Sequence, residues 1–290
     1  MGLRLKFNLA ILAVFAVGFA AAWVALERQF VASARGEVLQ NARIMMAAAN
    51  AVRTYTSQRV GPALAAAPRD HFEPMTVPSY AAQTNFKALT ERYPDFTYKE
   101  AALNPTNPAD RATDWEADFI HAFRNRRGLE ELSAERETPT GPVLTLARPI
   151  TVSSEACLTC HSTPDRAPPA LLAQYGSSNG FGWSMGETVA AQIVSVPMAV
   201  ALETAQRNLH AAMVLLAAVF AGVMVVLNVL LHLTVVRPVV RISRLATDVS
   251  LGKADAPEFA AGGRDEIGEL GRAFTRMRRS LDQAMRMLGA

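Results

Sequence analysis

The chain has 290 residues, of which half are hydrophobic and 19% are charged, and its formal net charge is +3. Residues 27–210 carry 17 basic and 19 acidic side chains, whereas the remaining residues carry 12 and 7. The basic surplus therefore belongs to the two ends of the chain, and it gives no case for a nucleic-acid-binding protein.

Two long apolar runs flank the middle of the chain. The first covers residues 7–26 and follows Arg4 and Lys6, while the second covers residues 211–236 and precedes three arginines. Each run is long enough to cross a bilayer, and basic flanks mark the cytoplasmic side. The predicted divisions are a cytoplasmic N-terminus at 1–6, a transmembrane helix at 7–26, an outer domain at 27–210, a second transmembrane helix at 211–236 and a cytoplasmic domain at 237–290.

The first run has an alternative interpretation as a cleaved signal peptide, because Ala20-Ala21-Ala22 resembles a cleavage region. We favour an uncleaved anchor, since the run is long for a signal peptide and helical sequence continues beyond it. Under either interpretation the middle of the chain lies outside the cytoplasm.

The outer domain is predicted to be of the α+β class. Its elements in chain order are a helix over 27–60 ended by Gly61-Pro62, proline-broken loops over 68–108, a helix over 114–124, strands over 143–152 and 188–196 with a glycine-rich loop at 176–186 between them, and a helix from Met198 into the second apolar run. About 180 residues are enough for one domain with its own core.

The most informative motif is Cys157-Leu158-Thr159-Cys160-His161, which contains the only two cysteines of the chain. The spacing Cys-x-x-Cys-His is the attachment signature of a c-type haem. Each thiol can bond to a haem vinyl group, and the histidine that follows is then placed as the proximal iron ligand. The motif predicts one covalent haem c, with its iron, per chain, bound through Cys157, Cys160 and His161.

Other interpretations of this motif are weaker. A structural zinc site needs four ligands, but the sequence has no second Cys-x-x-Cys, and its five histidines are widely separated. A redox dithiol favours a βαβ setting, whereas the residues before Cys157 are predicted as a strand and those after it as a loop. A disulfide across so short a loop would stabilise the fold little. Because c-type haem is attached in an oxidising compartment, we expect a bacterial inner-membrane protein with a periplasmic haem domain.

Two amphipathic stretches follow the second apolar run. The apolar positions of the first are Pro238, Ile242, Leu245 and Val249, and those of the second are Ile267, Leu270, Phe274, Met277, Leu281, Ala284 and Leu288. A connector containing Gly252, Pro257, Gly262 and Gly263 separates them. One chain cannot bury both stripes, so the pattern predicts a parallel homodimer with a four-helix bundle. The alternative is a single basic helix lying on the inner leaflet.

This last segment resembles a HAMP domain, the signal-relaying module of bacterial receptors. The resemblance covers residues 232–288 and depends on Pro238 and on the signature Asp265-Glu266-Ile267-Gly268-Glu269-Leu270. It implies that a signal reaches a cytoplasmic partner. Since the sequence has no catalytic segment after this domain, we expect that partner to be a separate protein and this chain not to be an enzyme.

The outer domain resembles the Tll0287-like haem family over about residues 40–200. The matching stretches are Arg53-Thr54-Tyr55-Thr56, Val77-Pro78-Ser79-Tyr80, Tyr93-Pro94-Asp95-Phe96, Lys99 to Pro108 (KEAALNPTNP), Cys157 to Ser162, Tyr175-Gly176 and Gly180-Phe181-Gly182-Trp183. The resemblance implies a haem-binding periplasmic sensory domain with a PAS-like fold.

The second axial ligand cannot be transferred from that family. A member with a known haem site uses a cysteine of the N-terminal helix, and this chain has no third cysteine. Met46 is the first candidate in its place, and Arg53, seven residues further on the same helix face, is expected near a haem propionate. Met45, His71, His121 or an open position are the alternatives, and both methionines also suit ordinary helix packing.

The favoured function is a transmembrane haem sensor that responds to redox state or to a diatomic gas and relays the response through the HAMP domain. A membrane-anchored electron-transfer cytochrome c is the alternative, but it would need neither the second span nor the heptad pattern. A haem peroxidase or nitrite reductase is a third hypothesis, for which His121 with Arg124 is the only candidate distal pair.

Overall fold

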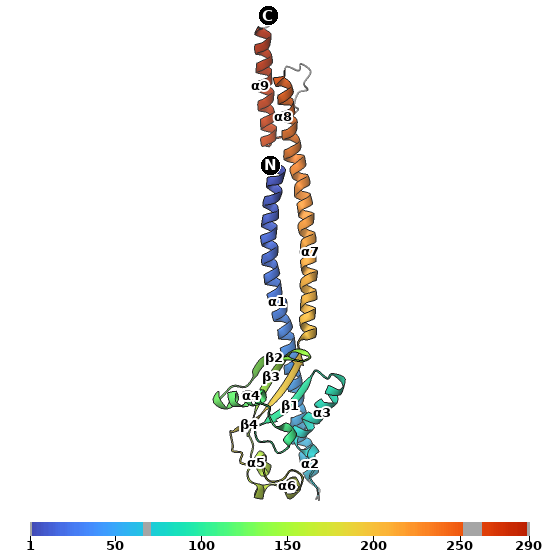
Figure 1. Cartoon of the computed structure of the whole chain (residues 1–290), viewed down its shortest axis with the longest axis vertical. Coiled ribbons are helices and arrows are strands. Elements are labelled where there is room, and N and C mark those ends of the chain that lie inside the picture. Colours follow the sequence, from blue (N-terminus) through green and yellow to red (C-terminus); the bar gives the residue numbers. More distant parts are fainter. Residues whose placement is uncertain (1, 66–70, 252–262, 289–290) are drawn as a thin grey trace. The chain divides into compact units, whose positions relative to one another are not determined.

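The structure is a computed structural model of the chain. It describes residues 2–65, 71–251 and 263–288. The chain divides into two compact units (Figure 1). One unit combines residues 1–26 with residues 209–290, and the other comprises residues 27–208. The second unit coincides closely with the outer domain predicted at 27–210.

The long N-terminal helix α1 runs from Leu3 to Tyr55 and includes the first apolar run. A π-helical turn at Thr56–Val60 and the short helix α2 at Gly61–Ala65 continue it. The prediction that Gly61-Pro62 ends the helix is therefore wrong. In the π-helical turn the N–H of Gly61 donates to the carbonyl of Thr56, so the hydrogen-bond register shifts directly before Pro62, which lacks an N–H.

The outer unit is built on a four-stranded antiparallel sheet in the order β1-β4-β3-β2. Its strands are β1 at Thr97–Ala102, β2 at Leu132–Thr138, β3 at Gly141–Thr151 and β4 at Thr188–Pro197. Its further helices are α3 at Pro78–Arg92, α4 at Asp114–Asn125, α5 at Glu155–His161 and α6 at Pro169–Tyr175. Strands β3 and β4 agree with prediction, whereas β1 and β2 were not predicted.

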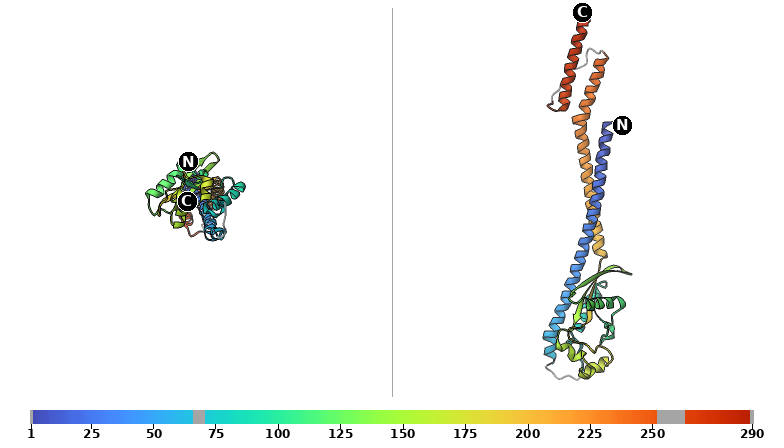
Figure 2. Two further views of the ribbon diagram at one scale, coloured as in Figure 1. Left: turned by 90° about the horizontal axis from the view of Figure 1, so that it is seen from below. Right: turned by 90° about the vertical axis from the view of Figure 1, so that its left-hand side faces the viewer.

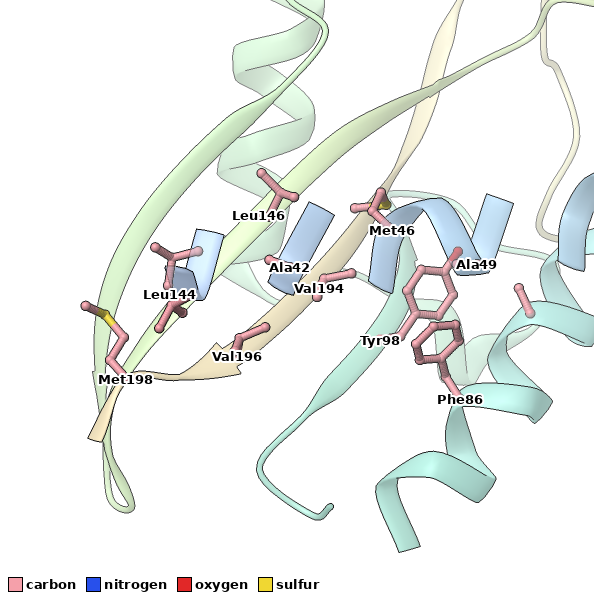
Figure 3. Close-up of a cluster of buried hydrophobic side chains, with 12 residues drawn as sticks. Ala42, Met46, Ala49, Phe86, Tyr98, Leu144, Leu146, Val194, Val196 and Met198 are labelled. Carbon is pink, nitrogen blue, oxygen red and sulfur yellow. The ribbon is translucent and has the colours of Figure 1, made fainter. Parts of the chain in front are cut away.

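Helices pack on both faces of this sheet (Figure 2). Helices α1 and α3 cover one face and form the largest core cluster, part of which is drawn in Figure 3. The buried residues of this first cluster are Val38, Ala42, Met46, Ala49, Ala82, Phe86, Tyr98, Leu144, Leu146, Val194, Val196 and Met198. Helix α4 covers the other face, where Ile120 and Phe123 pack against alanines of β1, β3 and β4. The mixed helix and sheet domain is confirmed, and the PAS-like fold stays a prediction.

In the other unit, helix α7 at Ala199–Leu231 continues through a π-helical turn at His232–Val236 into α8 at Arg237–Ser250. The rings of Phe15 and Phe220 stack with their centroids 4.6 Å apart, so α1 and α7 lie side by side in this unit. Both helices are long and apolar enough to cross a membrane.

Helix α9 at Glu266–Leu288 packs against α8. Ile242 and Leu245 of α8 are buried against Phe274 of α9. Leu270, Met277 and Leu281 of the predicted heptad pattern remain 46%, 59% and 49% exposed within the single chain. The parallel coiled-coil homodimer stays a prediction, and the connector positions 252, 257 and 262 lie outside the described residues.

Candidate functional site

The Cys-x-x-Cys-His motif forms the short helix α5. Ser154 caps this helix, because its hydroxyl accepts a hydrogen bond of 3.2 Å from the backbone N–H of Ala156. The prediction of a loop after Cys157 is therefore wrong, since helical structure continues to His161. Cys157 and Cys160 are three residues apart and thus share a helix face. Both thiols are free and only partly buried.

His161 is held in one orientation by the glycine-rich loop. Its Nδ1 lies 2.7 Å from the carbonyl oxygen of Gly180, and its ring stacks on Trp183 with the centroids 3.8 Å apart. A carbonyl only accepts hydrogen bonds, so Nδ1 carries the ring proton and Nε2 keeps its lone pair. Burial lowers the pKa of His161, although the bond to Gly180 acts in the opposite direction. The imidazole is therefore a neutral ring with a fixed tautomer, which is the form that binds metals.

Position 180 requires a glycine in this arrangement. Its φ is +84°, and a Cβ added there would lie 2.0 Å from the hydroxyl oxygen of Thr106. The Thr106 hydroxyl is itself 3.5 Å from His161 Nδ1. Two backbone bonds, from the N–H groups of Gly182 and Trp183 to the carbonyls at Ser162 and His161, tie the loop to the end of α5. The sequence identified this loop and the stretch containing Thr106, but it did not predict that they meet at His161.

The thiols lie beside an apolar cluster. Cys157, Leu158 and Trp183 pack against Val152 and Val189 among others. Burial, and then the neighbouring Cys157, raise the pKa of the Cys160 thiol. A redox dithiol requires a lowered thiol pKa, so this environment does not suit one. Within the described residues no three His, Cys, Asp or Glu side chains converge as a metal site. The two thiols and the imidazole thus do not surround a single ion.

Ser162 follows the motif and has an unsatisfied hydroxyl. Its Oγ is buried and finds no hydrogen-bond partner in the described part of the chain. A buried polar atom without a partner is costly. The two free thiols and the oriented imidazole are the donor set that a c-type haem requires.

The candidate sixth ligand Met46 lies elsewhere in the core. Its side chain is fully buried in the first cluster, whereas Cys157 packs against the third cluster, which contains Val152 and Val189. Met45 is partly buried against the same first cluster. The structure thus shows both methionines in the packing role that the sequence left open for them. It does not bring Met46 together with His161.

Arg53 forms an ion pair with Glu100, whose side chain is 4% exposed. The hydroxyl of Tyr98 donates a 2.6 Å hydrogen bond to the other carboxylate oxygen of Glu100. The Gln192 amide donates to Tyr98 at 2.9 Å and to Asn50 at 3.0 Å. Burial and the Glu100 charge raise the pKa of Tyr98 far above its ordinary value. A buried polar network therefore joins α1 to strands β1 and β4, which the sequence did not predict.

The two remaining ligand candidates lie on the surface. His71 is 74% exposed and lies 2.6 Å from a carboxylate oxygen of Glu73. His121 is an exposed residue of α4. Arg124, its proposed distal partner, instead donates a 2.7 Å hydrogen bond to the carbonyl of Thr188. The sequence hypothesis of a catalytic His121 and Arg124 pair gains no support from this geometry.

Comparisons with known proteins give two family matches. The model of the Tll0287-like family matches residues 29–197, and that of the HAMP domain matches residues 230–283. Among solved structures, the crystal structure of the cyanobacterial heme-protein Tll0287 aligns with 18% sequence identity and a TM-score of 0.42. That alignment covers 56% of this chain and 95% of the other. No curated protein matches the sequence.

Proposed function

Because this chain belongs to the Tll0287-like family over residues 29–197 and carries a HAMP domain over residues 230–283, we propose that it is a membrane receptor that detects its stimulus at a covalently bound c-type haem. Both families are those that the sequence motifs predicted. A sensory domain joined to HAMP makes the chain a signal-transducing membrane protein, and neither family is a catalytic one. The haem, its iron ligands and the stimulus are proposals.

The observation that carries the proposal is the state of His161. Its Nδ1–H is engaged by Gly180, so Nε2 is left as an iron ligand at the end of a helix that presents two free thiols. Cys157 and Cys160 would hold the haem through thioether bonds to its vinyl groups, and His161 would bind its iron. The bound haem would supply an iron centre that changes oxidation state and takes diatomic ligands.

The residues around α5 would position this group. Trp183 fixes the plane of the His161 ring by stacking on it, and the apolar cluster beside Cys157 excludes water from one side. Met46 as the second axial ligand and Arg53 near a propionate stay predictions. Met46 would have to leave its core packing, and Arg53 would have to serve the haem while paired with Glu100.

The membrane arrangement follows from the charges. The two apolar helices and the HAMP domain fit an inner-membrane protein. We place residues 27–210 in the periplasm, since the basic surplus lies in the other parts of the chain. This side of the membrane is also where c-type haem is attached.

The path for a signal follows chain continuity. Helix α1 contains the first apolar run. It also contributes Val38, Ala42, Met46 and Ala49 to the first core cluster. Strand β4 ends at Pro197, and α7 begins at Ala199. A small shift in the packing of the outer unit would therefore reach both spans, and the HAMP helices would change between two packings in a homodimer. A cytoplasmic partner would read that change.

The test uses the full chain, produced in a host that matures c-type cytochromes. 4-Fluorophenylalanine at position 274 would report α8 and α9 packing through its ¹⁹F shift. We expect the shift to differ between the oxidised and reduced protein, and between the reduced protein with and without carbon monoxide if a gas is the stimulus. The Cys157→Ser/Cys160→Ser variant should show neither difference, and His121→Ala should behave as the wild type. If the ¹⁹F shift of the wild-type chain is the same in every haem state, the result would contradict the sensor function and favour an electron carrier.

A further inference from the structure

A crevice lies where the second apolar helix ends, within the unit formed by residues 1–26 and 209–290. Its volume is about 660 Å³, and side chains of α1, of the His232–Val236 turn and of α8 line it. Its basic side chains are Arg4, Arg237, Arg241, Arg244 and His232. No acidic side chain lines it within the described part of the chain. The crevice therefore concentrates positive charge contributed by two separate helices.

Three of the arginines lie in the first turns of α8, at the end of the second apolar run. Arg237 directly follows the last residue of the apolar run, and Arg241 and Arg244 follow on the same face of α8. The stretch from 237 to 244 rises about 10 Å along the helix, which is comparable to the polar layer of one leaflet. Ile242 and Leu245 are buried against Phe274, and Leu245 also lines the crevice, so the crevice borders the core of α8 and α9.

The lining identifies the ligand class. Guanidinium groups bind phosphate oxygens in a bidentate fork, so several of them around one crevice suit a phosphate. Val236 and Val240 line the same crevice, and Val240 is 42% exposed. A free phosphate ion makes no apolar contact with valine side chains. A phospholipid has glycerol and acyl carbons next to its phosphate, and these carbons would pack against the valines. The combined lining thus favours a lipid.

We propose that the crevice lined by Arg4, Arg237 and Arg244 binds the headgroup phosphate of an anionic phospholipid. Arg4 of α1 donates a hydrogen bond to the His232 ring, which begins the π-helical turn before α8. A bound phosphate would compete for the Arg4 guanidinium and so change the link between the two helices at the entrance to the HAMP domain. This site is independent of the haem and does not rest on its presence.

The experiment uses the full chain in phosphatidylcholine bilayers that contain a trace of spin-labelled phosphatidylglycerol. The measured quantity is the preference of the protein-bound lipid fraction for this label over spin-labelled phosphatidylcholine. The test variant is Arg237→Gln/Arg244→Gln, and Arg4→Gln tests the contribution of the other helix. The matched control is Arg276→Gln/Arg286→Gln, which removes the same charge from exposed positions of α9.

We expect the preference for phosphatidylglycerol to fall about fivefold for each crevice arginine removed, including Arg4, because each arginine near an anionic surface contributes a comparable attraction. The α9 control should keep the wild-type preference, and inorganic phosphate should not reduce it. An unchanged preference in the crevice variants would overturn the proposal. Equal losses in the crevice and control variants would also overturn it, since only general charge attraction would then act. Competition by inorganic phosphate would show that the ligand is the free ion.

Discussion

Replacing Gly180 by alanine should displace the loop that orients His161. The backbone there has a φ of +84°, and an alanine side chain in such a conformation costs about 1–2 kcal/mol. The added Cβ would also lie 2.0 Å from Thr106 Oγ1 and 2.9 Å from its Cα, so the loop must move. Movement breaks the hydrogen bond from His161 Nδ1, which contributes a further ~1 kcal/mol. We expect a total loss of about 2–3 kcal/mol in the free energy of unfolding.

Gly182 provides the matched control in the same loop. Its φ is +83°, but a Cβ added there meets nothing within 4 Å. Gly182→Ala should therefore show only the backbone cost of about 1–2 kcal/mol. Chemical denaturation of the full chain in detergent, monitored by tryptophan fluorescence, measures the free energy of unfolding of both variants. Equal losses for the two alanine variants would refute the steric argument.

The same pair of variants tests the role of Gly180 in tuning the iron. A histidine whose Nδ1–H is hydrogen-bonded is a more basic ligand, which favours the oxidised metal. Gly180→Ala should therefore raise the reduction potential of the haem, and Gly182→Ala should leave it unchanged. A potential that stays constant in Gly180→Ala would show that the carbonyl bond does not influence the iron.

Three further predictions concern the rest of the fold. Glu100→Gln should destabilise the outer domain by about 3–5 kcal/mol, because it leaves the partly buried Arg53 without its carboxylate partner. Glu135→Gln, which removes an exposed ion pair, should cost less than about 1 kcal/mol. Chemical denaturation measures both losses. Burial alone would raise the pKa of Glu131, but hydrogen bonds from two arginines hold this pKa below its ordinary value of 4.5. The stabilisation is thus fully present above pH 4.5 and is lost as the pH falls below it, so unfolding measured across this range should show a weaker acid dependence in Glu131→Gln. Phe274→Ala should cost about 3–5 kcal/mol because the ring is buried between α8 and α9, whereas Met277→Ala, 59% exposed in one chain, should act mainly by weakening self-association in sedimentation.

The sequence predicted the elements whose side chains follow a simple pattern. Strands β3 and β4 have continuous apolar runs, as strands covered on both faces do. Strand β1 was missed because Lys99 and Glu100 interrupt its apolar character, and only the fold shows that Glu100 is buried beside Arg53. Strand β2 was missed because its less exposed face includes Arg136 and Thr138, so its sequence lacks an apolar period of two.

The site was predictable in its covalent motif but not in its surroundings. Cys157, Cys160 and His161 are adjacent in the chain, so their relation is fixed by local spacing. The contacts of His161 with Gly180 and Thr106 join segments 19 and 55 residues away, which no local pattern encodes. Met46 shows the same limit, because an apolar helix position suits a ligand and a core residue equally, and its burial depends on helix α3 and strands β1, β3 and β4.

The most direct test of the account is the intact mass of the full chain, purified under denaturing conditions from a host that matures c-type cytochromes. We predict that the wild-type chain carries the added mass of one haem, that Cys157→Ser/Cys160→Ser carries none, and that His161→Ala has an altered absorption spectrum. A wild-type chain with its unmodified mass, from a host shown to attach haem to a control cytochrome, would contradict the proposed function.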